Sequence, residues 1–356
     1  MPDSFSHPQT PAAKCLHLIR LRELTSRSEL VEATGLSQPT ITRAVAALGR
    51  FGYVAERTDL TRSNGRGRPT IPLELGEPAA IHAGVSVGTL STYIALFDLK
   101  GHTLRSMDLD IEVARVSEDD FIQHIMAGLN RLTAGINRPL ATVGVTTSGT
   151  VTSGGVIFAP NLGWRGVDIG AQLREQFSVP VMVTSAAAAI VGSEVQSHDH
   201  LDVPRIMALF ADDSLGCAVF TGEEVVPVAV DREDLTTAGL LEALEGIDTL
   251  ADAVRAAQDT PTVRACLDDR ARGLGELTAQ LWAEHQPSVV VVAGSAFIDD
   301  PRAPATFART VLKQVPDVDL RMIPTHREVV RDIARAAALD LALREPLSVA
   351  TSDFDI

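Results

Sequence analysis

The hydrophobic pattern of the first fifty residues predicts three short helices. Apolar positions recur at helical spacing, and the first two predicted helices cover residues 11–24 and 29–34, while the third follows Ser37 as its N-cap and ends at 51–54. Ser26 and Glu29 form a capping box before the second helix, which ends at Gly35. Two short helices joined by a Gly-Leu turn are typical of a helix-turn-helix.

The third predicted helix carries a polar face suited to base recognition. Its apolar residues form a single stripe, namely Ile41, Val45 and Leu48. The residues that we predict to contact DNA lie at its N-terminus and off this stripe: Ser37, Gln38, Thr40, Thr42 and Arg43. An α-helix fits the major groove, where short polar side chains and arginine recognise base edges. Taken alone, this segment also fits a helical hairpin of an unrelated bundle whose polar face is only solvated.

The segment after the third helix predicts a β-hairpin, which would form a wing. A strand opens after Tyr53 and a second covers 71–75, with a polar loop between them. The loop contains Gly65-Arg66-Gly67-Arg68-Pro69, which resembles the core of an AT-hook. We predict that Arg66 and Arg68 enter an A·T-rich minor groove. By itself this pentapeptide also fits a solvated basic loop, but the preceding helix-turn-helix favours DNA binding.

From residue 81 onwards, strand-like and helix-like patterns alternate. The predicted strands are 81–87, 92–98, 103–113, 140–146, 179–183, 206–210, 216–220, 225–230, 289–292 and 319–323. The predicted helices are 117–134, 170–177, 186–195, 240–257, 262–285, 303–314 and 328–343. Strands followed by helices, twice over, predict a two-lobed α/β body with a cleft between the lobes. The predicted domains are the winged helix-turn-helix over 1–76, a first lobe over 77–195 closed by the helix 328–344, and a second lobe over 196–327.

The charge is unevenly divided between these parts. The 356 residues carry a net charge of −15, with a balance of +3 over the first 75 residues and −18 over the rest. A mildly basic head on an acidic body is expected where one part meets phosphates and the other avoids them.

Composition and cysteine spacing indicate a cytoplasmic protein. No apolar run approaches the roughly 18–20 residues that span a bilayer, and residues 1–10 lack the pattern of a secretory signal. Cys15, Cys217 and Cys266 are far apart and lack metal-type spacing, which indicates buried thiols in a reducing compartment. We therefore expect neither a membrane partner nor a disulfide framework.

The chain resembles the ROK family of repressors and sugar kinases. The resemblance rests on the GRGRP wing, the strand order and the stretch Ala159-Pro160-Asn161-Leu162-Gly163-Trp164, and it extends over about 16–343. It implies a ribonuclease-H-like body of the actin/hexokinase type. Kinase members of the family phosphorylate sugars with ATP, whereas repressor members join the body to a DNA-binding head and respond to a sugar or a partner protein.

Two of the kinase motifs that the resemblance implies are altered in this sequence. The first phosphate loop of the family is Asp-x-Gly-Gly-Thr, and here Ser86 stands in place of the metal-binding aspartate. The catalytic segment of the family is Glu-Asn-Asp-Ala-Asn, and here Ala186 stands in place of the base. Alanine has no ionisable group to accept the proton of a sugar hydroxyl.

The second phosphate loop and the zinc site of the family are also altered. Asp212 and Asp213 lie where phosphate would bind, and like charges repel. The zinc-binding segment should fall within 226–242, which contains no cysteine and no histidine. His198 and His200 are interpreted as part of an exposed linker rather than as metal ligands. We predict no catalytic residue, no cofactor and no metal site.

The sequence thus predicts a DNA-binding regulator, a repressor of the ROK type that binds operator DNA as a homodimer. Four positions match retained residues near the family's sugar site and are predicted to bind a sugar or sugar-phosphate effector: Ser148, Gly149, Asn161 and Ser185. Their alternative role is a tight turn and a helix cap. Two other functions stay open, namely a regulator controlled by a protein partner without a small ligand, and a sugar kinase with an accessory head.

Overall fold

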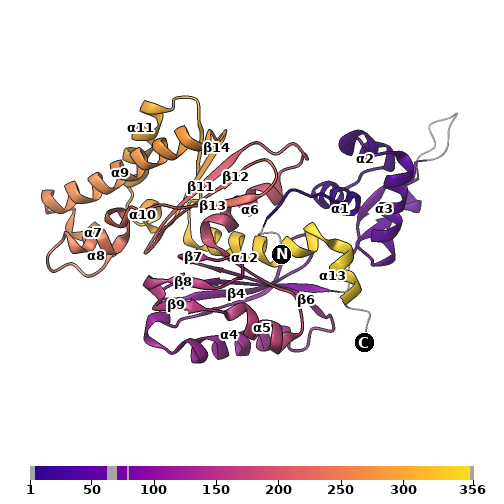
Figure 1. The fold of residues 1–356 in the computed structure, drawn as a ribbon, viewed down its shortest axis with the longest axis horizontal. Helices are drawn as coiled ribbons and strands as arrows, with labels where there is room; N and C mark the ends of the chain where they lie inside the picture. Colours follow the sequence, from indigo (N-terminus) through magenta and orange to yellow (C-terminus); the bar gives the residue numbers. More distant parts are fainter. Residues whose placement is uncertain (1–4, 62–69, 78–79, 353–356) are drawn as a thin grey trace.

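The computed structural model describes residues 5–61, 70–77 and 80–352. The N-terminal head contains three helices, α1 (Pro11–Leu21), α2 (Arg27–Thr34) and α3 (Gln38–Arg50). Two short strands follow, β1 (Val54–Glu56) and β2 (Leu73–Leu75), with a 3-10 turn at Thr58–Leu60. They pair antiparallel, so the head has the secondary structure of a winged helix-turn-helix (Figure 1). Arg66 and Arg68, at the predicted tip of the wing, lie outside the described residues.

The first helix is shorter than the sequence predicted. It ends at Leu21, and the chain turns extended at Arg22. Thr25 then pairs with Leu73 through two backbone hydrogen bonds of 3.0 and 2.7 Å. Residues 22–24, which were predicted to complete the helix, therefore lead into this bridge beside the wing. The pairing with β2 satisfies backbone N–H and C=O groups that would otherwise be satisfied within a longer helix.

The first lobe of the body is a five-stranded sheet with the order β10-β6-β3-β4-β5. Its strands are β3 (Ile81–Val87), β4 (Thr92–Phe97), β5 (Thr103–Leu109), β6 (Leu140–Thr147) and β10 (Val181–Ser185). The helices α4 (Glu118–Thr133) and α5 (Ile169–Phe177) cover one face of the sheet (Figure 1). A small sheet is added by β7 (Thr150–Val151), β8 (Ile157–Ala159) and β9 (Trp164–Val167), and 3-10 turns lie at Val113–Arg115 and Pro160–Leu162.

The second lobe repeats the topology of the first. Its strands are β11 (Ile206–Ala211), β12 (Leu215–Phe220), β13 (Val225–Val228), β14 (Val289–Ala293) and β15 (Asp319–Met322), in the order β13-β12-β11-β14-β15. In each lobe three antiparallel strands are followed by two parallel ones. The remaining elements of this lobe are a 3-10 turn at Glu233–Leu235 and the helices α7 (Thr237–Glu242), α8 (Leu250–Ala256), α9 (Pro261–His285), α10 (Ser295–Ile298) and α11 (Ala303–Gln314).

Two predicted elements of the body were wrong in extent. The predicted helix 240–257 is split into α7 and α8. Gly246 takes a left-handed φ of 73°, and the Thr249 hydroxyl caps α8 by accepting from the Asp252 amide. The predicted strand 103–113 ends at Leu109, because its partner β4 begins opposite that residue, at Thr92.

The helices α6 (Ala186–Ser197) and α12 (His326–Arg344) lie between the two sheets, and α13 (Pro346–Ser352) follows α12. Two glycines let α12 approach the first sheet closely. A Cβ at Gly84 would lie 2.3 Å from the Ala334 carbonyl oxygen, and one at Gly144 would lie 2.1 Å from the Ala337 carbonyl carbon.

The domain boundaries 1–76, 77–195 and 196–327 stay predictions. Among the described residues, no helix is long and apolar enough to cross a membrane.

Candidate nucleic-acid interface and interlobe cavity

The helix α3 is built by a cap at one end and an apolar stripe on one face. Ser37 is the N-cap, and its hydroxyl accepts from the Thr40 amide at 3.4 Å. Ile41, Val45 and Leu48 are buried against the rest of the head, as the sequence predicted. The stripe fixes the orientation of the helix and directs the remaining positions outward.

Most of the predicted DNA-contacting residues lie on the exposed part of α3. Ser37, Gln38, Thr42 and Arg43 are exposed, whereas Thr40 is half-buried. The Thr42 hydroxyl donates to the Gln38 carbonyl at 2.9 Å, and Arg43 Nε donates to the Pro39 carbonyl at 3.4 Å. These local bonds hold two of the side chains along the helix, so their polar ends are presented from a rigid element.

A cavity of about 850 Å³, which the sequence did not reveal, separates one side of α3 from the body. Thr40 and Arg43 line it from the head. Glu223 and Glu224, in the turn between β12 and β13, line it from the body, together with the junction of α12 and α13. The head therefore sits beside α13, at one side of the two lobes (Figure 1).

An N-terminal arm, residues 5–9, joins the head to the second lobe. Its backbone pairs with the edge strand β13, where the Val225 amide donates to the Phe5 carbonyl at 2.9 Å. The His7 amide donates to the Glu223 carbonyl at 2.7 Å. The Phe5 side chain is buried in the core formed by α6, α12 and the strands of the second lobe. A lone phenylalanine in a polar N-terminus carries no periodic signal, so this contact could not be predicted from the pattern of residues.

Two buried basic side chains of α1 form a further contact with the body. His17 Nε2 lies 2.9 Å from the His198 carbonyl, and Arg20 donates to the Gln196 carbonyl. Burial, and to a smaller extent the nearby Arg20, lowers the pKa of His17 to about 4. Burial likewise lowers the pKa of Arg20 to about 10. The linker that contains His198 thus serves as a hydrogen-bond acceptor for the head.

Acidification is expected to destabilise the protein through His17. An unfolded histidine has a pKa near 6.5, so between about pH 6.5 and 4 the unfolded state binds more protons, and stability falls as the pH drops. The loss from this group at pH 5 is about 2 kcal/mol. Urea denaturation at pH 7 and pH 5 checks this. In the His17→Gln variant the glutamine can still donate to the carbonyl but does not titrate. Between pH 7 and pH 5 the free energy of unfolding of this variant should therefore fall by about 2 kcal/mol less than that of the unmodified protein. An equal loss in both proteins would show that His17 is not the responsible group.

A cavity of about 980 Å³ lies between the lobes, lined by β6, β10, the start of α6, β12, β13 and the end of α12. Three of the four predicted ligand residues, Ser148, Gly149 and Ser185, line it. Asn161 does not line it, but its amide donates to the Ser148 hydroxyl at 2.9 Å. Gly149 has a left-handed φ of 80°, and Ser185 is the N-cap of α6, accepting from the Ala188 amide at 3.2 Å. The alternative roles of turn and cap therefore account for the local geometry of Gly149 and Ser185.

The two turns matched to kinase phosphate loops bond directly to each other. The hydroxyl of Thr89, in the β3–β4 turn, donates to the Asp213 carboxylate of the β11–β12 turn at 2.6 Å. Asp212 accepts from the Ser295 hydroxyl at 2.5 Å, and burial raises the pKa of its carboxyl. A contact between the lobes thus joins the two turns that the resemblance matches to phosphate loops, and carboxylates there would repel phosphate oxygens.

The position of the catalytic base and the zinc segment do not fit the chemistry of a kinase member either. Ala186 begins α6 and lines the cavity with a methyl group. The segment 226–242 supplies no thiolate or imidazole, and the described part of the chain holds no group of three or more His, Cys, Asp or Glu side chains placed to hold a metal ion. These residues do not fit a zinc ion.

Comparison with known proteins shows which family part of the chain resembles. The family model described as "ROK family" matches residues 82–226. Within these residues the chain is similar to the ROK family. It is 28% identical over 345 residues to the transcriptional regulator Rv0485 of Mycobacterium tuberculosis, covering 85% of this chain and 78% of the relative. It is 27% identical over 187 residues to the xylose repressor of Bacillus subtilis, covering 49% of this chain and 47% of the relative.

Solved structures show the same fold with and without a head. A ROK family transcriptional regulator, described as a homologue of the E. coli Mlc protein, has a TM-score of 0.75 at 17% identity and covers 96% of this chain and 98% of its own. A ROK hexokinase from Thermus thermophilus has a TM-score of 0.60 at 17% identity and covers 73% of this chain and 99% of its own. The predicted two-lobed, actin-like ROK body is confirmed by these matches.

Proposed function

We propose that this ROK protein is a transcriptional repressor that binds operator DNA as a homodimer and has no kinase activity. The observation that carries the proposal is the rigid, exposed polar surface at the N-terminus of α3, which bears Gln38, Thr42 and Arg43. The names of its relatives support it, because those with the cited similarity are a transcriptional regulator and a xylose repressor.

In this proposal α3 enters the major groove. Gln38, Thr42 and Arg43 reach base edges, while Ser37 and Thr40, which bond to each other through their hydroxyls at 2.9 Å, position the helix end near the phosphates. Arg66 and Arg68 of the wing enter an adjacent A·T-rich minor groove. One head covers one half-site, so two-fold pairing of chains doubles the contacts and fits a palindromic operator.

The absence of kinase activity is proposed from the body's chemistry. Phosphoryl transfer depends on positioning of phosphate, metal and nucleophile together. Here Ala186 supplies no base, Ser86 replaces the metal-binding aspartate, and Thr89 bonds to Asp213 across the phosphate region. ATP-dependent phosphorylation of any hexose by the purified chain would contradict this part.

An effector in the interlobe cavity completes the proposal. The family resemblance implies a sugar or sugar phosphate, and the four predicted ligand residues are Ser148, Gly149, Asn161 and Ser185. Binding there would change the spacing of the lobes, and the arm and the α12–α13 junction connect the cavity walls to the head. If the cavity takes no ligand, control by a protein partner is the alternative.

The test of DNA binding is the wing. Genome-wide footprinting would supply the operator, and fluorescence anisotropy would then compare the unmodified protein with Arg68→Ala. We expect Arg68→Ala to weaken operator binding by about 1–3 kcal/mol and to relax the preference for A·T flanks. The matched control is Arg309→Ala, which removes an exposed arginine on α11, remote from the head (Figure 1). Equal affinity of the two variants would contradict the assignment of the wing to DNA.

A further inference from the structure

The cavity of about 850 Å³ beside α3 is bounded on one side by a flank of that helix. Thr40, Arg43 and Ala47 line it, and their spacing of three and four residues places them together between the buried stripe and the exposed face of α3. A cavity of this volume has the size of a small-molecule pocket. A DNA duplex therefore cannot enter the gap, and DNA that binds α3 must approach from the open side, where Gln38 and Thr42 lie.

Carboxylates predominate on the wall of this cavity that belongs to the body. Glu223 and Glu224 lie in the turn between β12 and β13, and Glu345 lies at the junction of α12 and α13. Arg344 also lines the cavity, but it pairs with the buried Asp340 at 3.3 Å. Glu223 and Glu224 are exposed, and neither belongs to an ion pair among the residues that the structure describes. Their negative charge is therefore not neutralised by a neighbouring cation of that part of the chain.

Backbone hydrogen bonds hold the β12–β13 turn from two directions. The Thr221 amide donates to the Glu224 carbonyl at 3.0 Å and closes the turn. The His7 amide of the N-terminal arm donates to the Glu223 carbonyl at 2.7 Å from the other side. The turn therefore keeps its position beside α3 unless β13 or the arm moves.

The phosphates of bound DNA would come close to this turn. A helix in the major groove has a sugar-phosphate backbone on each side of it, and the flank of α3 that carries Arg43 faces the turn across the cavity. Charges act on each other over about 8 Å at physiological ionic strength, which is comparable with the span of a small-molecule pocket. Glu223 and Glu224 therefore repel the phosphates that Arg43 attracts.

We infer that the β12–β13 turn restrains DNA binding, because its two carboxylates oppose the phosphates beside the Arg43 flank of α3. This inference rests on the proposed function and adds a means of regulation to it. From the turn, β13 continues into the wall of the interlobe cavity, which it lines with Val225 and Val228. A displacement of β13 that carries the turn away from α3 would relieve the restraint, and one that brings the turn closer would strengthen it.

The test is fluorescence anisotropy of the full chain, with the operator obtained by footprinting and with a duplex of unrelated sequence. We expect the double variant Glu223→Gln/Glu224→Gln to bind both duplexes about threefold or more tightly than the unmodified protein at about 0.1 M salt. Both duplexes should gain, because phosphates carry no sequence information. The gain should shrink as the salt concentration rises, because screening shortens the range of the repulsion.

The matched control is Glu118→Gln/Asp119→Asn, which removes the same two charges from the exposed start of α4. That helix covers the face of the first sheet turned away from α12 and lies remote from the head (Figure 1). The affinity of the control should stay within about twofold of that of the unmodified protein, since the separation exceeds the screening length. Equal affinities of the two double variants would overturn the inference.

The single variants Glu223→Gln and Glu224→Gln replace the double variant should it unfold, which thermal melting reports. Each should gain about twofold, because each removes one of the two carboxylates, and an unchanged affinity of both would overturn the inference. Failure of the unmodified protein to bind the operator would refute the proposed function and the restraint together. Operator binding that the turn variants leave unchanged would refute only the restraint.

Discussion

Phe5→Ala is expected to lower the free energy of unfolding by about 3–5 kcal/mol, although Phe5 precedes the N-terminal head. The side chain is 1% exposed, and a Cβ at Gly192 of α6 would lie 2.3 Å from its ring, so the aromatic ring occupies space that glycine leaves open. Truncation would leave a cavity in the core shared by the second lobe, α6 and α12. The measurement is urea denaturation at pH 7, monitored by circular dichroism.

Phe158→Ala is the matched control for this prediction. Phe158 lies on β8 and is 47% exposed, so its removal should change stability by less than about 0.5 kcal/mol. If Phe5→Ala lowered the free energy of unfolding as little as Phe158→Ala, the arm would not be packed into the core of the body. Phe5 also has a left-handed φ of 60°, a conformation that bulky residues rarely adopt. Burial of the ring and pairing with β13 compensate for that strain.

The position of Phe5 relates the expected loss of stability to the connection between the body and the head. The same arm pairs with β13, which lines the interlobe cavity, and leads directly into α1 of the head. A change in the position of β13 would therefore be transmitted to the head through covalent and hydrogen-bonded contacts. Loss of the Phe5 ring should weaken the attachment of the head as well as the core.

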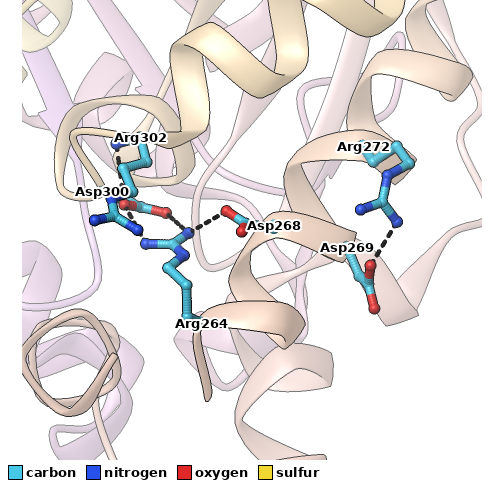
Figure 2. Close-up of polar contacts among 6 residues, drawn as sticks. All are labelled: Arg264, Asp268, Asp269, Arg272, Asp300 and Arg302. Carbon is cyan, nitrogen blue, oxygen red and sulfur yellow. Dashed lines mark hydrogen bonds and ion pairs between the residues drawn. The ribbon is translucent and has the colours of Figure 1, made fainter. Parts of the chain in front are cut away.

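Arg264→Ala is expected to destabilise the protein by about 3–5 kcal/mol, because it leaves a buried carboxylate without its partner. Arg264 on α9 donates to both oxygens of Asp300 at 3.0 and 2.5 Å, and also pairs with Asp268 at 2.9 Å (Figure 2). The Asp300 side chain is only 3% exposed. The paired carboxylates raise the pKa of Arg264, Asp300 most of all, so the guanidinium stays charged at neutral pH.

Arg272→Ala tests the same change in a solvated setting. Arg272 lies two turns further along α9 and pairs with Asp269 at 2.5 Å, with both side chains more than half exposed (Figure 2). Surface pairs of this kind contribute about 0–1 kcal/mol, so this variant should be nearly neutral. Chemical denaturation of the two variants side by side checks the prediction. Similar stability of both would mean that Asp300 is solvated in the absence of Arg264.

The Arg264–Asp300 pair holds the segment after α10 against α9 (Figure 2). This segment follows Ser295, whose hydroxyl donates to Asp212 beside the Thr89–Asp213 contact between lobes. Loss of the Arg264–Asp300 pair should therefore also loosen the second-lobe side of the Thr89–Asp213 contact, while leaving the described head unchanged.

The sequence alone determined most of the secondary structure and the resemblance to the ROK family. Strand 81–87 and helix 303–314 match the observed elements at both ends, because continuous apolar runs and regular helical spacing are local signals. The capping box at Ser26 and the cap at Ser37 were equally predictable, since each cap depends on residues three positions apart. The loss of a base at Ala186 needed no structure, because alanine lacks the required chemistry in any fold.

Only the tertiary structure decided which distant groups meet. Three contacts join segments that are far apart along the chain and leave no periodic pattern in the sequence. They are the packing of Phe5 against Gly192, the hydrogen bond from Thr89 to Asp213 and the ion pair of Arg264 with Asp300. The interlobe cavity likewise arises from strands of both lobes and a C-terminal helix brought together by folding. Local hydrogen bonding and hydrophobic spacing are encoded in neighbouring residues, whereas these contacts depend on how separately formed elements pack.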